Sequence, residues 1–263
     1  MDLGFKNRIA VVTGGSSGIG LAAARLLLNE GARVAICGRD PNRLEAARHE
    51  LTAVPGADVL AQRCDVLDRA DVERFAHAVA AWSGGKVDLL VNNAGQGRVS
   101  TFATTSDEDW RQELELKIFS QTLPIQAFRP LLERSDAAAI VGVNSLLALQ
   151  PEPHMVATAA ARASVQSLLK SLSVEFAPHI RVNSILLGLV ESGQWQRRFE
   201  ARADKTETRD TWFANLARSK HIPLGRLGQP EEAARAILFL GSPAASYITG
   251  ASLEISGGVS RHI

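Results

Sequence analysis

Cysteine, aromatic residues and an excess of either charge are all scarce in this chain of 263 residues. It has two cysteines, one tyrosine and 5% aromatic residues, and its 29 Lys and Arg nearly balance its 28 Asp and Glu. The balanced charge gives no broad field to attract nucleic acid or an anionic membrane surface, so we expect neither as a partner. No run of 18 apolar residues and no charged-then-apolar leader occur, which leads us to expect a cytoplasmic protein.

The two cysteines offer neither a disulfide framework nor a metal site. Cys37 and Cys64 each stand alone at the end of an apolar run, with no CxxC or Cys/His spacing around them. We expect both to be small core residues in a reducing compartment, and no bound metal. At this length the chain can bury a large core without such cross-links.

Short β-branched runs alternate with longer helical patterns along the whole chain. Nearly every run is continuously apolar, which predicts a parallel sheet covered by helices on both faces. We therefore predict an α/β fold of seven strands and six helices. The expected strands are residues 9–13, 34–37, 59–64, 89–91, 138–143, 181–187 and 253–255, and the helices are about 18–29, 40–52, 69–82, 106–133, 155–176 and a last one from 230.

One long segment, residues 191–222, shows no regular pattern and is rich in Arg, Gln and Trp. Segments of this length in compact domains tend to be binding loops or lids, so we predict that it covers the substrate. Its aromatic and cationic residues suggest an aromatic or anionic ligand, although the packing of an amphipathic lid helix would explain them equally well. They are Trp195, Arg197, Arg198, Trp212 and Phe213.

A glycine-rich turn, residues 13–20 (TGGSSGIG), separates the first strand from the first helix. Glycines at this point let the backbone and the helix N-terminus approach a pyrophosphate, which predicts a dinucleotide site. The same residues satisfy G-x-S-x-G, the nucleophile elbow of α/β-hydrolases, with Ser16 as nucleophile. A hydrolase normally has strands before its elbow, whereas Ser16 follows the very first strand, so the dinucleotide site is favoured.

Several motifs, in this order, resemble those of the short-chain dehydrogenase/reductase family over essentially all 263 residues. The resemblance implies a single Rossmann-type domain over residues 1–263, with a doubly wound seven-stranded parallel sheet and a homotetramer built through the two longest helices. The motifs are residues 13–20, Asp65-Val66, 92–95 (NNAG), 181–183 (RVN), 225–232 (GRLGQPEE), 247–250 (YITG) and 256–258 (SGG).

The end of the second strand favours NADP over NAD as the cofactor. An acidic residue there would accept hydrogen bonds from the ribose, whereas a cation accommodates the 2′-phosphate, and this chain has Gly38 followed by Arg39. Asp40 next to Arg39 is expected to cap the following helix. The cofactor contacts that the turn and the resemblance imply are Gly14, Ser16, Ser17, Gly18, Ile19, Gly20, Arg39, Asp65, Val66, Asn93, Ala94, Gly95, Arg162, Gly188, Val190 and Ser192.

The catalytic positions implied by the resemblance depart from the family pattern. The family has a tyrosine and a lysine spaced Y-x-x-x-K, and a serine thirteen residues before the tyrosine. Residues 170–175 (KSLSVE) fix the alignment and put Thr158 at the tyrosine position, Arg162 at the lysine position and Ser145 at the serine position. The spacing is therefore intact, while the proton-donating phenol has become a short hydroxyl.

The fourth position, an asparagine in the family, falls on Lys117, seven residues after Trp110. Arginine stays charged and does not exchange protons, and a threonine hydroxyl is a weaker acid than a phenol, so Lys117 is the better candidate for the acid. Arg162 as a like-charged neighbour would lower the pKa of Lys117. We expect a cationic pocket in which water or a small anion fills the space of the missing phenol ring.

These residues predict an NADP-dependent oxidoreductase that reduces a carbonyl compound, or oxidises the alcohol, on a small-molecule substrate. The catalytic set would be Lys117, Ser145, Thr158 and Arg162. Two alternatives stay open because fold alone does not decide function: a nucleotide-binding regulator or scaffold without turnover, and a lyase or isomerase on the same fold.

Overall fold

The computed structural model describes residues 2–202 and 205–261, without the side chains of Gln194 and Arg197. As the sequence predicts, seven strands form one parallel sheet, and their order in the structure is β3-β2-β1-β4-β5-β6-β7. The strands are β1 (Ile9–Thr13), β2 (Arg33–Gly38), β3 (Val59–Arg63), β4 (Leu89–Asn92), β5 (Ala139–Ser145), β6 (Arg181–Leu187) and β7 (Ser252–Ile255).

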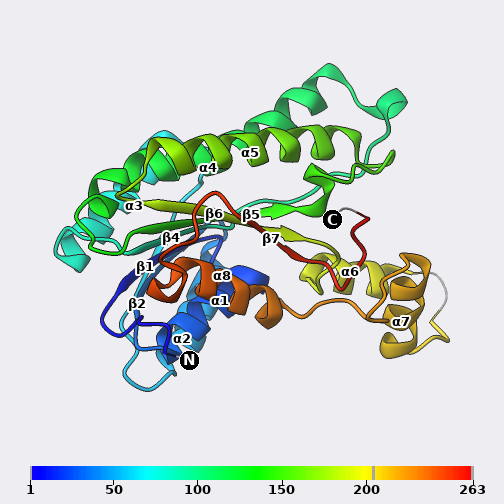
Figure 1. The fold of residues 1–263 in the computed structure, drawn as a ribbon. Helices are drawn as coiled ribbons and strands as arrows, with labels where there is room; N and C mark the ends of the chain where they lie inside the picture. The colour runs from blue at the N-terminus through cyan, green and yellow to red at the C-terminus, as the bar shows by residue number, and fades with distance from the viewer. Residues whose placement is uncertain (1, 203–204, 262–263) are drawn as a thin grey trace.

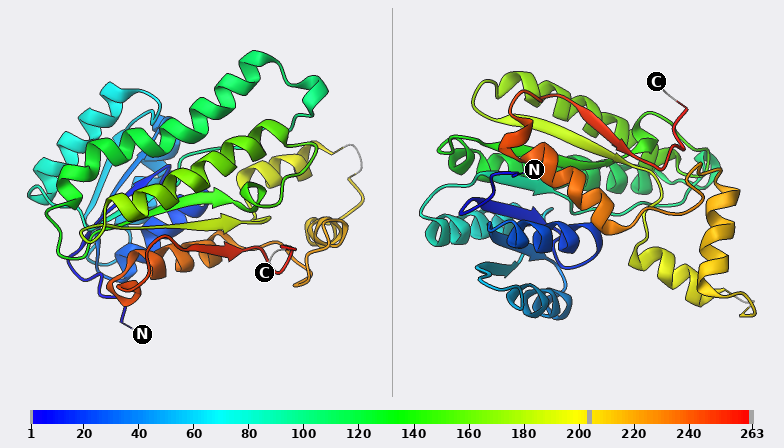
Figure 2. Two further views of the ribbon diagram at one scale, coloured as in Figure 1. Left: turned by 45° about the horizontal axis from the view of Figure 1, so that its top comes forward. Right: turned by 60° about the horizontal axis from the view of Figure 1, so that its bottom comes forward.

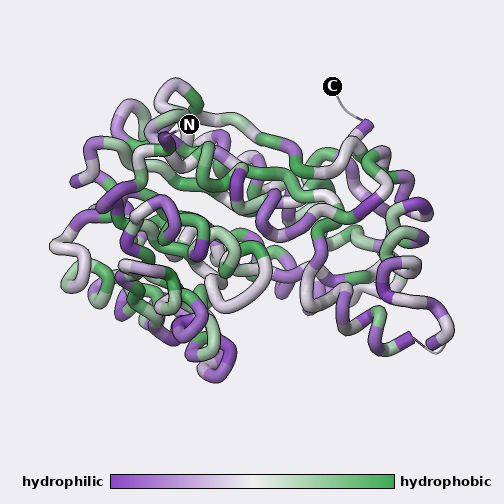
Figure 3. Tube along the Cα trace, turned by 90° about the horizontal axis from the view of Figure 1, so that it is seen from below, coloured by the Kyte–Doolittle hydropathy of each residue, from purple (hydrophilic) through white to green (hydrophobic). Residues whose placement is uncertain are grey.

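Helices cover both faces of this sheet (Figure 1). One face carries α1 (Gly18–Asn29), α2 (Pro41–Thr52) and α8 (Pro230–Gly241), and the other carries α3 (Arg69–Ser83), α4 (Asp107–Leu132) and α5 (Val156–Glu175). Successive strand residues enter opposite layers: Ala10 and Val12 pack with the first set of helices, Ile9 and Val11 with the second. The apolar interior and the polar outer turns of the helices are visible in Figure 3.

Two further helices, α6 (Gly193–Ala201) and α7 (Arg209–Ser219), lie apart from the two layers beyond the end of β6 (Figure 2). The expectation of an irregular segment over residues 191–222, and of six helices in all, is therefore wrong. Phe213 and Ala217 are buried against Ile222 and Leu227 in a small core of their own. That core forms only once segments on either side of α7 fold back together, which local periodicity does not show.

The sheet places its switch point beside the glycine-rich turn. β1 lies between β2 and β4. Strands β2 and β3 therefore extend the sheet on one side of β1, and strands β4 to β7 extend it on the other side. In open α/β sheets such a crevice at the carboxyl ends of the strands is where ligands bind. Among the described residues no helix is long and apolar enough to cross a membrane.

Candidate active site

The turn after β1 is held in one shape by steric contacts and by the asparagine that directly follows β4. Gly14 has φ of +65°, and a Cβ on Gly20 would lie 2.3 Å from the carbonyl oxygen of Gly14. Asn93 Nδ2 donates to the carbonyls of Thr13 and Gly14 at 3.0 and 3.1 Å. The backbone at the N-terminus of α1 is thereby left open to an anionic ligand.

The end of β2 presents one cation to the same crevice. A Cβ on Gly38 would lie 2.9 Å from Ser16 Oγ, so the acidic side chain typical of NAD sites would require Ser16 to move. Asp40 accepts from the backbone N–H groups of Asn42 and Arg43, as expected for the cap of α2. Arg39 lines the crevice and has no carboxylate partner among the described residues.

A single cavity of about 710 Å³ connects this turn with three of the four predicted catalytic positions, namely Ser145, Thr158 and Arg162. Gly18, Gly20 and Lys117 are not part of its lining. The predicted cofactor contacts that do line it are Gly14, Ser16, Ser17, Ile19, Arg39, Asp65, Val66, Asn93, Ala94, Gly95, Arg162, Gly188, Val190 and Ser192.

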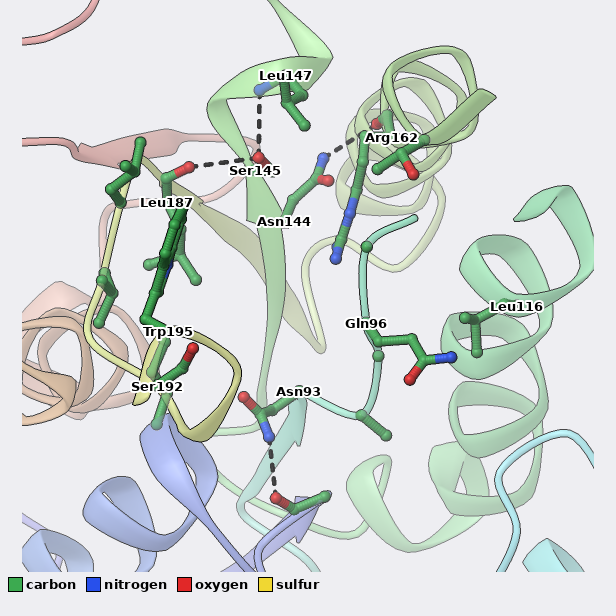
Figure 4. A pocket seen from close by; sticks show the side chains of 18 of the residues that line it. Asn93, Gln96, Leu116, Asn144, Ser145, Leu147, Arg162, Leu187, Ser192 and Trp195 are labelled. Atoms are coloured by element: carbon green, nitrogen blue, oxygen red, sulfur yellow. Dashed lines mark hydrogen bonds between the residues drawn. The ribbon is translucent and has the colours of Figure 1, made fainter. Parts of the chain in front are cut away.

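Ser145 ends β5 and faces the cavity between two backbone groups. Its Oγ donates to the carbonyl of Leu187 at 3.3 Å and accepts from the N–H of Leu147 at 3.2 Å (Figure 4). The first of these bonds is long and leaves its proton available to a better acceptor. A substrate oxygen in the cavity is such an acceptor.

Arg162 reaches from α5 into the cavity beside Asn144 (Figure 4). Its Nη1 donates to the carbonyl of Val143 at 3.0 Å, whereas its Nε is buried without a hydrogen-bond partner. Burial lowers the pKa of Arg162 to about 10, so the guanidinium stays charged at neutral pH. The residue lines the cavity, where the hydroxyl or phosphate oxygens of a ligand could accept from its remaining N–H groups.

Thr158 lines the cavity but is only 2% exposed, and its hydroxyl takes part in a buried cluster that the sequence did not predict. Its Oγ1 lies 2.5 Å from Oε2 of Glu113, and that same oxygen lies 2.9 Å from Nζ of Lys117. Lys117 and Glu113 are both buried, one turn apart on α4. The expected cationic pocket of Lys117 and Arg162 is corrected here, because Lys117 does not line the cavity and a carboxylate stands between it and the Thr158 hydroxyl.

The pKa of Lys117 is lowered, as expected, but chiefly by burial and only then by the charge of Arg162. Glu113 acts in the opposite direction and raises it. Glu113 was missed because its Thr158 partner is distant in sequence. The i,i+4 spacing of Glu113 and Lys117 on a predicted helix was the one signal that could have found it.

The far end of the cavity is lined by side chains from both ends of the 191–222 segment. Trp195 and Arg198 line it, with the Arg198 guanidinium 4.7 Å from the centre of a Trp195 ring. Trp212 and Phe213 instead pack on each other and on Phe199. Ligand binding therefore remains open for Trp195 and Arg198, whereas packing explains Trp212 and Phe213. The Arg197 side chain lies outside the described part of the chain.

In the cavity lining, one carboxylate contacts both a histidine and a lysine. Glu152 lies 3.1 Å from His154 Nε2 and 3.3 Å from Lys220 Nζ, and all three line the cavity. Lys220 comes from the segment after α7, so this contact ties that segment to the entrance of α5. Residues near the active site and near the predicted lid are thus connected.

The two cysteines are free and buried, as expected for core residues. Cys37 lies at the end of β2 and Cys64 directly after β3. The neighbouring Cys64 thiol and burial raise the pKa of Cys37 well above its ordinary value. Both features make this thiol unreactive. Among the described residues no group of His, Cys, Asp and Glu side chains could hold a metal ion.

The doubly wound sheet, the pinned glycine turn and the cavity beyond it define a dinucleotide-binding protein of the Rossmann class. A family model described as enoyl-(acyl carrier protein) reductase matches residues 14–260. The chain belongs to the short-chain dehydrogenase/reductase family.

Known proteins similar to this chain include one with an unusual site. The apo structure of a short chain oxidoreductase from Pseudomonas aeruginosa PAO1, described as containing an atypical catalytic center, is 60% identical with a TM-score of 0.94, over 97% of this chain and 98% of that one. An NADPH-bound structure of the same description is 58% identical with a TM-score of 0.92, over 98% and 100%. The 3-oxoacyl-[acyl-carrier-protein] reductase FabG of Chlamydia muridarum is 33% identical, over 96% of this chain and 97% of the relative.

Proposed function

We propose that this chain is an NADP-dependent oxidoreductase that reduces a carbonyl compound, or oxidises the corresponding alcohol, with an atypical Lys-Ser-Thr-Arg site. One observation carries the proposal: a single cavity is lined both by the phosphate-binding turn with Arg39 and by Ser145, Thr158 and Arg162. A cofactor in the first part would lie next to a substrate in the second. The similarity to NADPH-bound and carbonyl-reducing relatives supports this reading.

The residues present fit NADP. Arg39, which has no carboxylate partner among the described residues, would hold the 2′-phosphate. The backbone before α1, with Ser16 and Ser17, would hold the pyrophosphate, and Arg162 would hold the ribose hydroxyls. By family resemblance, the adenine, adenosine ribose and carboxamide contacts would be Asp65, Val66, Asn93, Ala94, Gly95, Gly188, Val190 and Ser192. When bound, NADPH supplies the hydride.

The chain's own groups would then bind and protonate the substrate. Ser145 holds the substrate oxygen, since its Oγ faces the cavity and makes one weak bond of its own. Lys117 is the source of the proton, and Thr158 is the member of its cluster that reaches the cavity. We propose residues 1–263 as one NADP-binding domain in which the 191–222 segment, with Trp195 and Arg198, closes over the substrate.

The test is NADPH binding followed by turnover. NADPH affinity is measured by fluorescence titration, and oxidation is followed with 9,10-phenanthrenequinone, ethyl acetoacetate and a 3-oxoacyl thioester. Binding with turnover of at least one probe is expected. Tight binding without turnover of any carbonyl across a broad panel would instead support the nucleotide-binding regulator. The structure offers a reason for such an outcome, because the Thr158 hydroxyl already makes hydrogen bonds to other groups of the protein.

For the assembly, we propose a homotetramer built through α4 and α5, which lie side by side on one face (Figure 1). These helices leave large apolar side chains exposed, with Phe119 47% and Val174 73% accessible. Light scattering after gel filtration should give four times the mass of one chain, and Val174→Lys should dissociate the assembly. A cytoplasmic location stays a prediction, consistent with the free thiols of Cys37 and Cys64.

A further inference from the structure

Glu113 occupies the centre of a buried polar cluster at the wall of the active-site cavity. Glu113, Lys117 and Thr158 are 3%, 1% and 2% exposed. A single carboxylate oxygen, Oε2, lies 2.9 Å from Lys117 Nζ and 2.5 Å from Thr158 Oγ1. Thr158 lines the cavity, whereas Glu113 and Lys117 lie behind it. Any proton that Lys117 exchanges with the cavity along these contacts therefore passes Glu113 and Thr158.

The surroundings of the Thr158 hydroxyl allow its proton to change partners. The backbone N–H of Arg98 donates to Oγ1 at 3.1 Å, and the carbonyl of Arg98 accepts from it at the same distance. A hydroxyl has one proton, so Thr158 donates either to Glu113 or to the Arg98 carbonyl. If Glu113 carries a proton, it becomes the donor and the Thr158 proton is free to go elsewhere.

Charge explains why a carboxylate is needed at this position. Lys117 is faced by Glu113 on its own helix, by Arg162 from α5 and by Arg98 from the segment after β4. Arg98 also pairs with Asp109, which offsets its charge. Without Glu113, the buried ammonium would have two cationic neighbours and no buried anion. Glu113 thus favours the protonated form of Lys117, which burial and the like charges disfavour.

We propose that Glu113 is a positioning residue of this active site that links Lys117 to Thr158 in a proton path. The inference rests on the proposed carbonyl reduction. As the substrate alkoxide takes the Thr158 hydroxyl proton, the Glu113 carboxylate receives a proton from the Lys117 ammonium and passes a proton on to Thr158, so Glu113 ends the step ionised as it began. One O–H bond forms on the product and one N–H bond breaks on Lys117; solvent reprotonates the neutral amine before the next turnover.

A titration that needs no substrate tests the link. The chain has six lysines, so the side-chain signal of Lys117 in [13C,15N]-lysine-labelled protein is assigned by its loss in Lys117→Met. Glu113→Gln keeps the shape and removes the charge. We expect Lys117 to deprotonate about one to three pH units lower in this variant. The matched control is Glu115→Gln, an exposed glutamate on the same helix, which should leave the titration unchanged. Equal titration in wild type and Glu113→Gln would overturn the proposal.

Turnover with the carbonyl probes tests use of the path. Glu113→Gln should lower kcat at least about tenfold and move the alkaline limb of its pH profile to lower pH, with NADPH affinity unchanged. Glu113→Asp should recover part of kcat. A merely structural role would lower kcat without moving the limb. If no probe is turned over even by wild type, the proposed function fails, while the lysine titration still decides whether Glu113 controls Lys117.

A double variant keeps the proposal testable if the single variant does not fold. Removing one member of a buried ion pair leaves the other uncompensated, whereas replacing both is often tolerated. If Glu113→Gln does not fold, Glu113→Gln/Lys117→Met should fold and be no more active than Lys117→Met alone. Wild-type activity in the double variant would exclude the path.

Discussion

Nζ of Lys117 lies 2.9 Å from Oε2 of Glu113, one turn earlier on α4, and both side chains are almost fully buried. The contact changes how the site is understood, because the positive group predicted to face the substrate faces a carboxylate instead. Thr158 contacts Glu113 of this pair and also lines the cavity. The site is therefore a layered one, with a hydroxyl in front and an ion pair behind it.

Replacing Arg39 with Asp should weaken NADPH binding selectively. Arg39 lines the cavity beside Gly38 and has no carboxylate partner in the described part of the chain. Loss of a charge-assisted contact to the 2′-phosphate should cost about 1.5 to 3 kcal/mol, or about one to two decades of NADPH affinity. Dissociation constants for NADPH and NADH measure this. NADH binding should change far less, and equal wild-type affinities for the two would contradict the assignment.

Lys117→Met should slow carbonyl reduction more than Thr158→Val. Lys117 supplies the proton, whereas a water molecule can take over part of the role of the Thr158 hydroxyl. The expected loss for Lys117→Met is about a hundredfold or more in kcat. Both variants must be folded and bind NADPH for the comparison. If the order is reversed, Thr158 is itself the acid.

The rate of reduction should fall at high pH. Burial, and then the charge of Arg162, lower the pKa of Lys117 below its ordinary value of 10.5. The protonated acid is present below this lowered pKa and is lost as the pH rises through it. Steady-state kcat measured from pH 6 to 10 should show this limb in wild type and in the control Lys6→Met. It should be missing from Lys117→Met.

Gly20→Ala should weaken both the fold and cofactor binding. In a helix this change normally stabilises by up to about 1 kcal/mol. Here the new Cβ would meet the Gly14 carbonyl at 2.3 Å and Asn93 Nδ2 at 2.5 Å, neither of which can move freely. We expect a net loss of about 1 to 3 kcal/mol in urea unfolding and weaker NADPH binding. A variant as stable as wild type would show that the turn is not held as described.

Arg198→Met should raise the KM for an anionic carbonyl without changing NADPH affinity. Arg198 lines the far end of the cavity but is exposed, so the effect should be at most about fivefold. Comparing levulinate with its ethyl ester isolates the charge. The matched control is Arg202→Met, since Arg202 also lies over an aromatic ring but does not line the cavity. Equal KM changes for acid and ester would exclude an ionic contact.

The order of the seven strands along the chain, the glycine turn and the cap at Asp40 were determined by the sequence alone. Each depends on local chemistry: apolar runs bounded by turn residues, a left-handed position at Gly14, and a carboxylate one residue before Pro41. The common cavity of Thr158, Arg162 and Ser145 was also predictable, since residues 158 and 162 share one face of a helix and Ser145 ends a strand.

Tertiary structure alone decided which groups these residues meet. Glu113 and Thr158 are 45 positions apart and come together only because α4 packs on α5. The helices α6 and α7 are fixed by the small core around Phe213, which no local pattern reveals. In both cases the stabilising contact joins distant segments, and its energy appears only after the chain has closed the loop between them.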